Sequence, residues 1–283
     1  MTMQSLEGRK EMESDNNLKA FANDIRIETI KCLKKRGFGH VGGCMSIVET
    51  LSVLYGSVMK YDAKNPQWED RDYFILSKGH GGPALFATLA LKGFFPVNWL
   101  DTLCEPKTLL PSHCDRLRTP GVDVSTGSLG QGLSVADGIA KGFKIKGKDN
   151  WVYVILGDGE CAEGQNWEAA QFASHFKLSH VVAFVDWNKR QVDGYINDVM
   201  SLGDIEGKFK AFGWYAATVS GSDTEAIKTA IENAKKEHGE MPIAIVLDGV
   251  KGSGVPEFEE MFDNHFFNLD AELADKAIAR LEA

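Results

Sequence analysis

The apolar residues of this chain fall into two kinds of segment that alternate along most of its length. Short continuous apolar runs are typical of buried strands, whereas longer stretches with apolar residues three and four positions apart are typical of amphipathic helices. Strands are predicted at 73–76, 151–156, 181–185, 215–219 and 243–247. Helices are predicted at 25–35, 47–61, 83–91, 129–143, 167–176, 204–212, 223–236 and 269–281.

The order of these segments predicts the fold class. Strands that alternate with helices indicate an α/β fold, with a mostly parallel sheet and helices on both faces. A glycine-rich loop is expected at 37–43. The polar, charged segment 1–15 is expected to be a mobile N-terminal arm, followed by a single domain at 16–283.

Two of the predicted strands end in residues that can bind a metal ion. The run 151–156 leads into Gly157, Asp158 and Gly159, and the run 181–185 leads to Asn188. One crossover helix fits between them, so parallel neighbouring strands would present Asp158 and Asn188 at the same edge of the sheet. Mg²⁺ accepts such oxygen ligands and completes its shell with phosphate oxygens and water. The two glycines would let the backbone approach a diphosphate. The alternative is an ordinary turn in which Asp158 caps a helix.

Composition and charge narrow the classes of partner. The 283 residues, 43% hydrophobic and 25% charged, can bury one large α/β core or two smaller ones. A net charge of −9 disfavours a nucleic-acid partner. Five cysteines without a CxxC pair fit a reducing cytoplasm better than a disulfide framework or a zinc site. No uncharged stretch is as long as a membrane span and no signal sequence is visible, so a cytoplasmic protein without a membrane partner is expected.

Four of the seven histidines lie in or next to glycine-rich or turn-forming loops. They are His40, His80, His113 and His265. A single loop histidine is most often an ordinary surface residue, but four histidines placed near the ends of predicted elements indicate a shared site. Histidine suits proton transfer near neutral pH and hydrogen bonding to an oxygen that gains charge.

Five motifs, in this order and spacing, resemble those of transketolases. They are Gly-His-Val-Gly-Gly at 39–43, Ser-Lys-Gly-His at 77–80, Ser-Thr-Gly-Ser-Leu-Gly-Gln-Gly at 125–132, Gly-Asp-Gly at 157–159 and Asp-Trp-Asn at 186–188. The resemblance runs from about residue 25 to His265 and covers only the N-terminal, diphosphate-binding domain of a full-length transketolase. Two residues depart from the family pattern: Val41 stands where proline is usual, and Phe266 stands where glycine is common.

The resemblance implies a role for individual residues. Thiamine diphosphate would be the cofactor, and Asp158, Asn188 and the backbone carbonyl of Arg190 would bind Mg²⁺ or Ca²⁺. The other expected cofactor-side residues are His80, Gly157 and Gly159 at the diphosphate, Gly127 and Leu129 at the aminopyrimidine, Val192 at the thiazolium, and Lys251. Glu163 resembles a carboxylate that pairs with acidic residues across a dimer interface beside the cofactor. His40, His113 and His265 would line the substrate channel and act on the donor sugar.

The family's activity follows from its cofactor. Transketolases move a two-carbon ketol unit from a ketose to an aldose, and thiamine diphosphate supplies the carbanion chemistry. The glutamate that activates the cofactor belongs, in this family, to the pyrimidine-binding domain, and nothing in this chain matches it. The chain ends soon after His265, without room for that domain. The resemblance therefore implies the N-terminal subunit of a split transketolase, which acts on sugar phosphates with a C-terminal partner subunit in an α₂β₂ assembly.

Three other hypotheses remain at this point. An α-subunit of a 2-oxo-acid dehydrogenase would share the metal motif but lack the loop histidines. Deoxyxylulose-phosphate synthase normally continues into its second domain. A non-catalytic paralogue that serves as a partner would have lost Asp158, Asn188 or the loop histidines, and all of these are present. The sequence leaves the donor open among an ordinary phosphoketose, a branched sugar phosphate and a sulfonated ketose.

Overall fold

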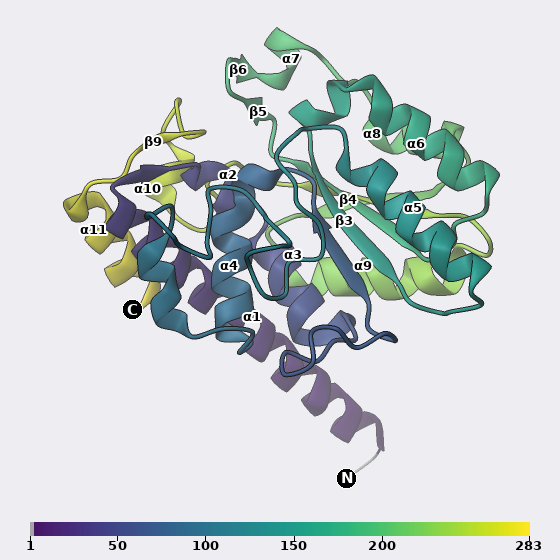
Figure 1. The fold of residues 1–283 in the computed structure, drawn as a ribbon, viewed down its shortest axis with the longest axis horizontal. Coiled ribbons are helices and arrows are strands. Elements are labelled where there is room, and N and C mark those ends of the chain that lie inside the picture. Colours follow the sequence, from purple (N-terminus) through teal and green to yellow (C-terminus); the bar gives the residue numbers. More distant parts are fainter. Residues whose placement is uncertain (1–2) are drawn as a thin grey trace.

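A five-stranded parallel sheet forms the centre of the protein (Figure 1). Its strands lie in the order β2-β3-β4-β8-β7. The computed structural model describes residues 3–283, with side chains from residue 17 onward. The strands are Tyr73–Leu76 (β2), Val152–Gly157 (β3), Val181–Trp187 (β4), Tyr215–Ser220 (β7) and Ile243–Asp248 (β8). Every neighbouring pair is parallel. The predicted α/β class and all five predicted strands are confirmed.

Helices cover both faces of this sheet (Figure 1). One core cluster joins one face to Met3–Arg36 (α1), Val48–Val53 (α3), Gly82–Leu91 (α4) and Thr224–Glu237 (α9). A second core cluster joins the opposite face to Gly132–Ile145 (α5), Gly164–His175 (α6) and Ile205–Ala211 (α8).

The strand β3 is apolar throughout because both faces of the sheet are covered by helices. Tyr153 and Ile155 belong to the first core cluster, and Val154 and Leu156 belong to the second. All four side chains are fully buried. Because successive side chains of a strand point to opposite faces, a strand covered on both sides must be a continuous apolar run rather than an alternating one.

Shorter elements complete the chain around the edges of the sheet. They are the helices Val41–Met45 (α2), Ile196–Val199 (α7), Pro256–Glu259 (α10) and Ala271–Leu281 (α11), the short 3-10 or π turns Leu54–Val58 (η1), Gly79–Gly81 (η2), Val97–Thr102 (η3) and Gly159–Ala162 (η4), and the strands Phe38–Gly39 (β1), Arg190–Gln191 (β5), Gly194–Tyr195 (β6) and Phe267–Asn268 (β9). The strand β1 pairs antiparallel with β9, and β5 pairs antiparallel with β6.

The expectation of a plain loop at 37–43 is wrong. This segment contains the short strand β1 and the start of α2. The Gly42 N–H donates a hydrogen bond of 3.0 Å to the carbonyl oxygen of Asn264, and a Cβ at Gly42 would collide with that oxygen. This contact joins segments more than two hundred residues apart, so the local sequence pattern could not predict the ordered structure of 37–43.

Several predicted helix boundaries also differ from the structure. The helix predicted at 25–35 is the C-terminal part of α1, which begins at Met3. The helix predicted at 47–61 ends at Val58, and its last five residues form the π turn η1. The helix predicted from Leu129 begins at Gly132. Gly130 has a φ of +84°, which is incompatible with a right-handed helix, so Leu129 stays in the preceding loop. The mobile arm at 1–15 stays a prediction: α1 includes residues 3–15, and residues 1–2 lie outside the described part of the chain.

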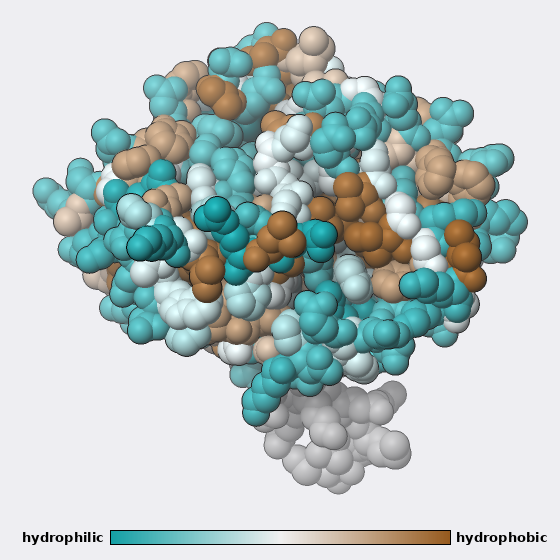
Figure 2. All heavy atoms as spheres, viewed as in Figure 1, coloured by the Kyte–Doolittle hydropathy of each residue, from teal (hydrophilic) through white to brown (hydrophobic). Residues whose placement is uncertain are grey.

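One stretch of the described residues, Val41–Val58, has the length and apolarity of a membrane span. Its mean hydropathy is 1.3, and 83% of it is buried inside the fold. The stretch runs through α2, α3 and η1, and its one charged residue, Glu49, forms an ion pair with Arg26. Packing in the core therefore accounts for the apolarity of this stretch. On the face that Figure 2 shows, apolar side chains lie in small groups among hydrophilic ones.

Candidate active site at the carboxyl edge of the sheet

Asp158 and Asn188 lie at the same edge of the sheet, as their positions after neighbouring strands predict. In the register of β3 and β4, Gly157 lies opposite Asp186. Asp158 accepts a hydrogen bond of 2.7 Å from the Gly159 N–H and another of 2.7 Å from the Lys189 N–H. Both side chains are almost fully buried, with exposed fractions of 3% for Asp158 and 5% for Asn188.

Asp186, which belongs to the Asp-Trp-Asn motif but received no role from the sequence, organises this edge. Its Oδ2 atom accepts hydrogen bonds from Lys78 Nζ at 2.5 Å, Ser46 Oγ at 2.7 Å and Asn188 Nδ2 at 2.9 Å. Because the amide nitrogen of Asn188 is held by Asp186, its Oδ1 atom turns the other way and accepts from the Arg190 N–H at 3.1 Å. The orientation of the predicted metal ligand is thus fixed by a buried ion pair.

The electrostatics at Asp158 fit a bound cation. Burial, and then the nearby carboxylate of Asp186, raise the pKa of Asp158 to about 7. A divalent cation beside Asp158 would favour the charged carboxylate and offset both effects. Among the described residues, no three His, Cys, Asp or Glu side chains are grouped to hold a metal ion. The predicted set does not depend on such a group, because it combines one carboxylate with an amide and a backbone carbonyl.

The third predicted ligand, the carbonyl of Arg190, is contacted by Lys251. Lys251 Nζ donates to this carbonyl at 3.0 Å and lies 2.9 Å from His265 Nδ1. Lys251 is 2% exposed, and burial, followed by the charge of Lys78, lowers its pKa to about 8. The structure therefore places Lys251 between the predicted metal ligands and the histidines.

The four loop histidines, which are far apart in the sequence, come together in one cluster. The ring centroid of His40 lies 5.4 Å from that of His80, 5.9 Å from that of His113 and 5.2 Å from that of His265. The centroids of His80 and His265 are 5.0 Å apart. All four imidazoles are partly buried.

Their surroundings keep these imidazoles neutral near pH 7. Burial, with the neighbouring His113, lowers the pKa of His40 to about 4. Burial, with the charge of Lys251, lowers the pKa of His265 to about 3. Burial and Lys78 hold the pKa of His80 well below its usual value, and burial lowers that of His113. A neutral imidazole offers one N–H donor and one acceptor nitrogen, so the cluster can hydrogen-bond several oxygens of a ligand.

The loop that contains Gly127 packs directly against the loop before His80. A Cβ at Gly79 would lie 2.8 Å from the backbone nitrogen of Gly127, so glycine is needed for this approach. Gly127 itself has a φ of +139°, which side chains rarely tolerate. Gly127 packs against the ring of His113: a Cβ built on Gly127 would lie 3.2 Å from His113 Cδ2.

Glu160 ties three of the glycine-rich motifs together. This buried carboxylate accepts hydrogen bonds from Ser77 Oγ, from the Gly130 N–H at 2.8 Å and from the Gly157 N–H at 2.9 Å. Sequence reasoning missed Glu160 and Lys78. The available signal was a charged residue inside a glycine motif that directly follows a buried strand, which is the position of both.

Three further predicted residues lie at the surface. Leu129 is 40% exposed and Val192 is 67% exposed. Glu163, which precedes α6, is exposed too, and its Cβ lies close to Gly130. The fold alone does not bring these side chains into contact with the histidines.

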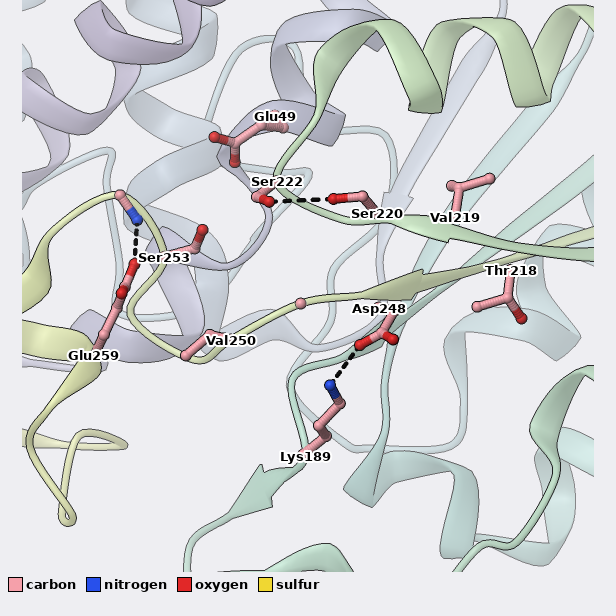
Figure 3. Close-up of a pocket in the computed structure, with 12 residues that line it drawn as sticks. Glu49, Lys189, Thr218, Val219, Ser220, Ser222, Asp248, Val250, Ser253 and Glu259 are labelled. Atoms are coloured by element: carbon pink, nitrogen blue, oxygen red, sulfur yellow. Dashed lines mark hydrogen bonds and ion pairs between the residues drawn. The ribbon is translucent and has the colours of Figure 1, made fainter.

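A large cavity adjoins this site but holds none of the histidines (Figure 3). It measures about 780 Å³ and lies at the carboxyl ends of β7 and β8. Lys189 and Asp248 form an ion pair of 2.5 Å on one side of it, and Ser220 and Ser222 hydrogen-bond at 3.2 Å on the other (Figure 3). The size of this cavity does not make it the candidate site, because none of the four clustered histidines lines it.

Comparison with known proteins identifies similar chains. The family described as "Transketolase, thiamine diphosphate binding domain" matches residues 17–281. A protein of Clostridium sp. (strain MSTE9), named 6-deoxy-6-sulfo-D-fructose transketolase subunit SqwG, is 48% identical over 95% of this chain and 98% of its own length. A protein of Phocaeicola vulgatus, named as one of the subunits of an apulose-4-phosphate transketolase, is 34% identical over 95% of this chain and 92% of its own.

Solved structures show the same likeness. The crystal structure of a transketolase from Campylobacter jejuni superposes with a TM-score of 0.87 at 28% identity. The match covers 94% of this chain and 43% of that chain. The chain therefore spans about two fifths of the length of the transketolase structures that it matches.

Proposed function

The chain belongs to the transketolase family, whose thiamine-diphosphate-binding domain it matches, and we propose that it acts as the N-terminal subunit of a split transketolase together with a separate C-terminal subunit. Two relatives named as transketolase subunits are covered over 98% and 92% of their own lengths, which supports this assignment. The proposed reaction transfers a two-carbon ketol unit from a ketose donor to an aldose acceptor.

One observation carries this proposal. Asp158 and Asn188 follow adjacent parallel strands, and at the same edge three neutral histidines gather around a fourth, His40. A site for a metal-bound diphosphate next to a cluster of neutral hydrogen-bonding groups suits a reaction in which a carbonyl oxygen gains and loses charge.

We assign the binding of thiamine diphosphate and Mg²⁺ to this edge. Asp158, Asn188 and the Arg190 carbonyl would hold the metal ion, and Gly157, Gly159 and His80 would face the diphosphate. When bound, thiamine diphosphate supplies a carbanion that adds to the ketose carbonyl.

The histidines of this chain would bind and orient the donor sugar. The lowered pKa values of His40, His113 and His265 keep these rings uncharged, so each would offer one N–H donor and one acceptor nitrogen to the carbonyl and hydroxyl oxygens of the sugar. A fixed donor to an oxygen that develops charge lowers a barrier by roughly 3 kcal/mol. Lys251, next to His265, adds positive charge beside the cluster.

The partner subunit would supply the pyrimidine-binding half, including the glutamate that activates the cofactor. Two copies of each subunit would form the assembly, since most oligomers adopt closed symmetry. The free cysteines fit a cytoplasmic enzyme. The donor named for the relative from Clostridium, 6-deoxy-6-sulfo-D-fructose, belongs in any substrate panel, together with ordinary and branched ketose phosphates.

The test is a reconstitution assay. The chain is mixed with its candidate C-terminal subunit, thiamine diphosphate, Mg²⁺, a panel of ketose donors and an aldose acceptor. Ketol transfer from at least one donor, lost on treatment with EDTA and restored by Mg²⁺, is the expected result. Cofactor binding without any transfer across the panel would contradict the proposed function.

A further inference from the structure

Two exposed phenylalanines, Phe38 and Phe266, pack on each other, and Phe266 also packs on His40 of the histidine cluster. The strand β1 pairs antiparallel with β9, with Gly39 opposite Phe267, and this pairing brings the segment before His40 next to the segment after His265. The Leu269 N–H donates to the Gly37 carbonyl at 2.9 Å and closes the pairing. The backbone therefore sets the positions of Phe38 and Phe266 on either side of this junction.

The rings of these phenylalanines form a continuous surface. The ring centroids of Phe38 and Phe266 lie 5.6 Å apart, and the ring of Phe266 meets that of His40 edge-to-face at 4.8 Å. The guanidinium of Arg36 lies over the ring of Phe38, 4.5 Å from its centroid. Edge-to-face packing and a cation over a ring both restrict ring orientation, so this surface is held in place.

The surface is open on one side. Phe38 is 37% exposed and Phe266 is 49% exposed, although Phe266 contacts the imidazole of His40 and Phe38 contacts the guanidinium of Arg36. A single exposed apolar residue needs no explanation, but two rings in mutual contact, one of which packs on an imidazole of the cluster, add apolar area where a ligand would bind.

We propose that Phe38 and Phe266 form an aromatic wall beside His40 that selects ketose donors with an unbranched carbon chain. The inference rests on the proposed function and refines its substrate class. Because the ring of Phe266 packs edge-to-face on His40, a donor with an oxygen bonded by His40 brings the neighbouring carbon, and any substituent on it, within reach of that ring.

The chemistry of a branch makes the wall selective. A hydroxymethyl branch at that carbon adds both volume and a hydroxyl group. Against a phenyl ring the hydroxyl loses its water without gaining a partner. One extra carbon in an apolar pocket alters kcat/KM by roughly 10- to 200-fold. An unbranched donor presents only hydrogen at this place and meets no such penalty.

The experiment compares matched donors on the reconstituted assembly. Fructose 6-phosphate and 6-deoxy-6-sulfo-D-fructose share an unbranched chain and differ in the terminal anion, whereas apulose 4-phosphate is branched. The wild type is expected to favour the better unbranched donor over apulose 4-phosphate by about 10-fold or more in kcat/KM. Phe266→Gly should lower this ratio about 10-fold by raising the value for the branched donor, and Phe38→Ala should lower it in the same direction.

Two controls separate the wall from general effects on the loop. Phe266→Leu keeps apolar bulk and should keep the preference. Phe262→Ala removes another exposed ring from the same loop. The ring of Phe262 packs on Tyr195, with centroids 5.9 Å apart, rather than on the histidines, so this change should leave the donor ratio unchanged. Calorimetric titration provides a readout without turnover: Phe266→Gly should bind apulose 4-phosphate more tightly in the cofactor-free assembly, with an unchanged affinity for thiamine diphosphate.

The outcomes are distinct. An unchanged donor ratio in both Phe266→Gly and Phe38→Ala, with normal cofactor affinity, overturns the wall and leaves the transketolase function intact. A wild-type preference for the branched donor does the same. Absence of transfer from every donor would instead overturn the proposed function.

Discussion

A buried ion pair organises the side of the site that we propose for the diphosphate. The ion pair of Lys78 and Asp186 is almost fully buried, with side chains 1% and 2% exposed. Removing two charges from water costs about as much as their attraction returns, so such a pair contributes little net stability. Its consequence is positional: Asp186 also holds Asn188, and Lys78 also donates to the Gly43 carbonyl at 2.8 Å. The pair therefore fixes a ligand and a histidine-bearing loop together.

Asp158→Ala should abolish metal-dependent binding of thiamine diphosphate while the fold stays intact. Loss of the one carboxylate in the predicted ligand set leaves the charge of the diphosphate uncompensated. The apo protein should tolerate the change, because a buried carboxyl with a pKa of about 7 is itself poorly solvated. Calorimetric titration of the assembly with cofactor and Mg²⁺ should show affinity at least about 100-fold weaker. Asp193→Ala, which removes an exposed carboxylate nearby, is the control, and equal affinities for both variants would remove Asp158 from the site.

His113→Ala should reduce turnover far more than it weakens cofactor binding. His113 packs against Gly127 and His40, where it can reach a donor oxygen. Loss of a hydrogen-bond donor to a developing charge typically lowers kcat about 10²- to 10³-fold. Steady-state kinetics and cofactor titration measure the two effects separately. His175→Ala, at the C-terminal end of α6, should change neither quantity. Normal turnover with lost cofactor affinity would place His113 in the diphosphate pocket instead.

At the scale of elements, the buried strands were predictable because a strand that is buried on both faces has a continuous apolar sequence. The bounds of β2 agree with the prediction at both ends. The relative placement of Asp158 and Asn188 was predictable too, because parallel neighbours present their carboxyl ends together. The short elements β1, β9 and α2 were not, since each depends on a contact with a distant segment rather than on its own periodicity.

The same distinction explains which parts of the site the sequence left unassigned. Histidines in loops could be identified by residue type, and the structure brings all four together. Glu160 could not be given a role, because its hydrogen-bond partners Ser77 and Gly130 lie in two other motifs. The expected roles of Val192, Leu129 and Glu163 stay predictions, since their side chains are exposed and would need another chain or a cofactor beside them.

The helix α5 carries a buried carboxyl that should make stability depend on pH. Asp137 is 2% exposed, and neither of its oxygens has a hydrogen-bond partner among the described residues. Burial raises its pKa to about 8 from an ordinary value of 3.8. The carboxyl is thus neutral in the fold and charged in the unfolded chain above pH 4. Its favourable contribution is complete below about pH 4 and is lost as the pH rises toward 8.

Asp137→Asn should therefore stabilise the protein at pH 8 and have a smaller effect at pH 5. The amide keeps the shape of the side chain and removes the need to protonate it, so the free energy of unfolding at pH 8 should rise by at least about 1 kcal/mol. Urea unfolding at the two pH values measures the difference. Asp149→Asn, an exposed position after the same helix, should change stability little at either pH. An equal effect of Asp137→Asn at both pH values would contradict the assigned titration.

At the scale of the whole molecule, the candidate site is open. Val192 and Leu129, the expected contacts to the thiazolium and aminopyrimidine rings, are 67% and 40% exposed. Leu117, in the loop after His113, is 81% exposed. Exposed apolar residues around a polar site are typical of surfaces that a partner covers. The site is thus bounded by the sheet on one side, and on the opposite side none of the described residues covers it.

The isolated chain should accordingly bind thiamine diphosphate weakly and transfer no ketol unit, and both properties should change when the C-terminal subunit is added. When only this subunit borders the site, the aromatic rings of the cofactor remain in contact with water. The histidines then cannot exclude water from an oxygen that develops charge. A second subunit that covers Val192 and Leu129 should strengthen cofactor binding by at least about 10-fold, because it buries apolar ring surface. Calorimetry and transfer assays, with and without the partner, measure the two effects, and native mass spectrometry should show two copies of each subunit in the active species. A surface variant that blocks association, Leu117→Asp, should lose the gain from the partner while the isolated chain stays folded. Full ketol transfer by the isolated chain, at a rate that added partner does not change, would contradict the split-enzyme proposal.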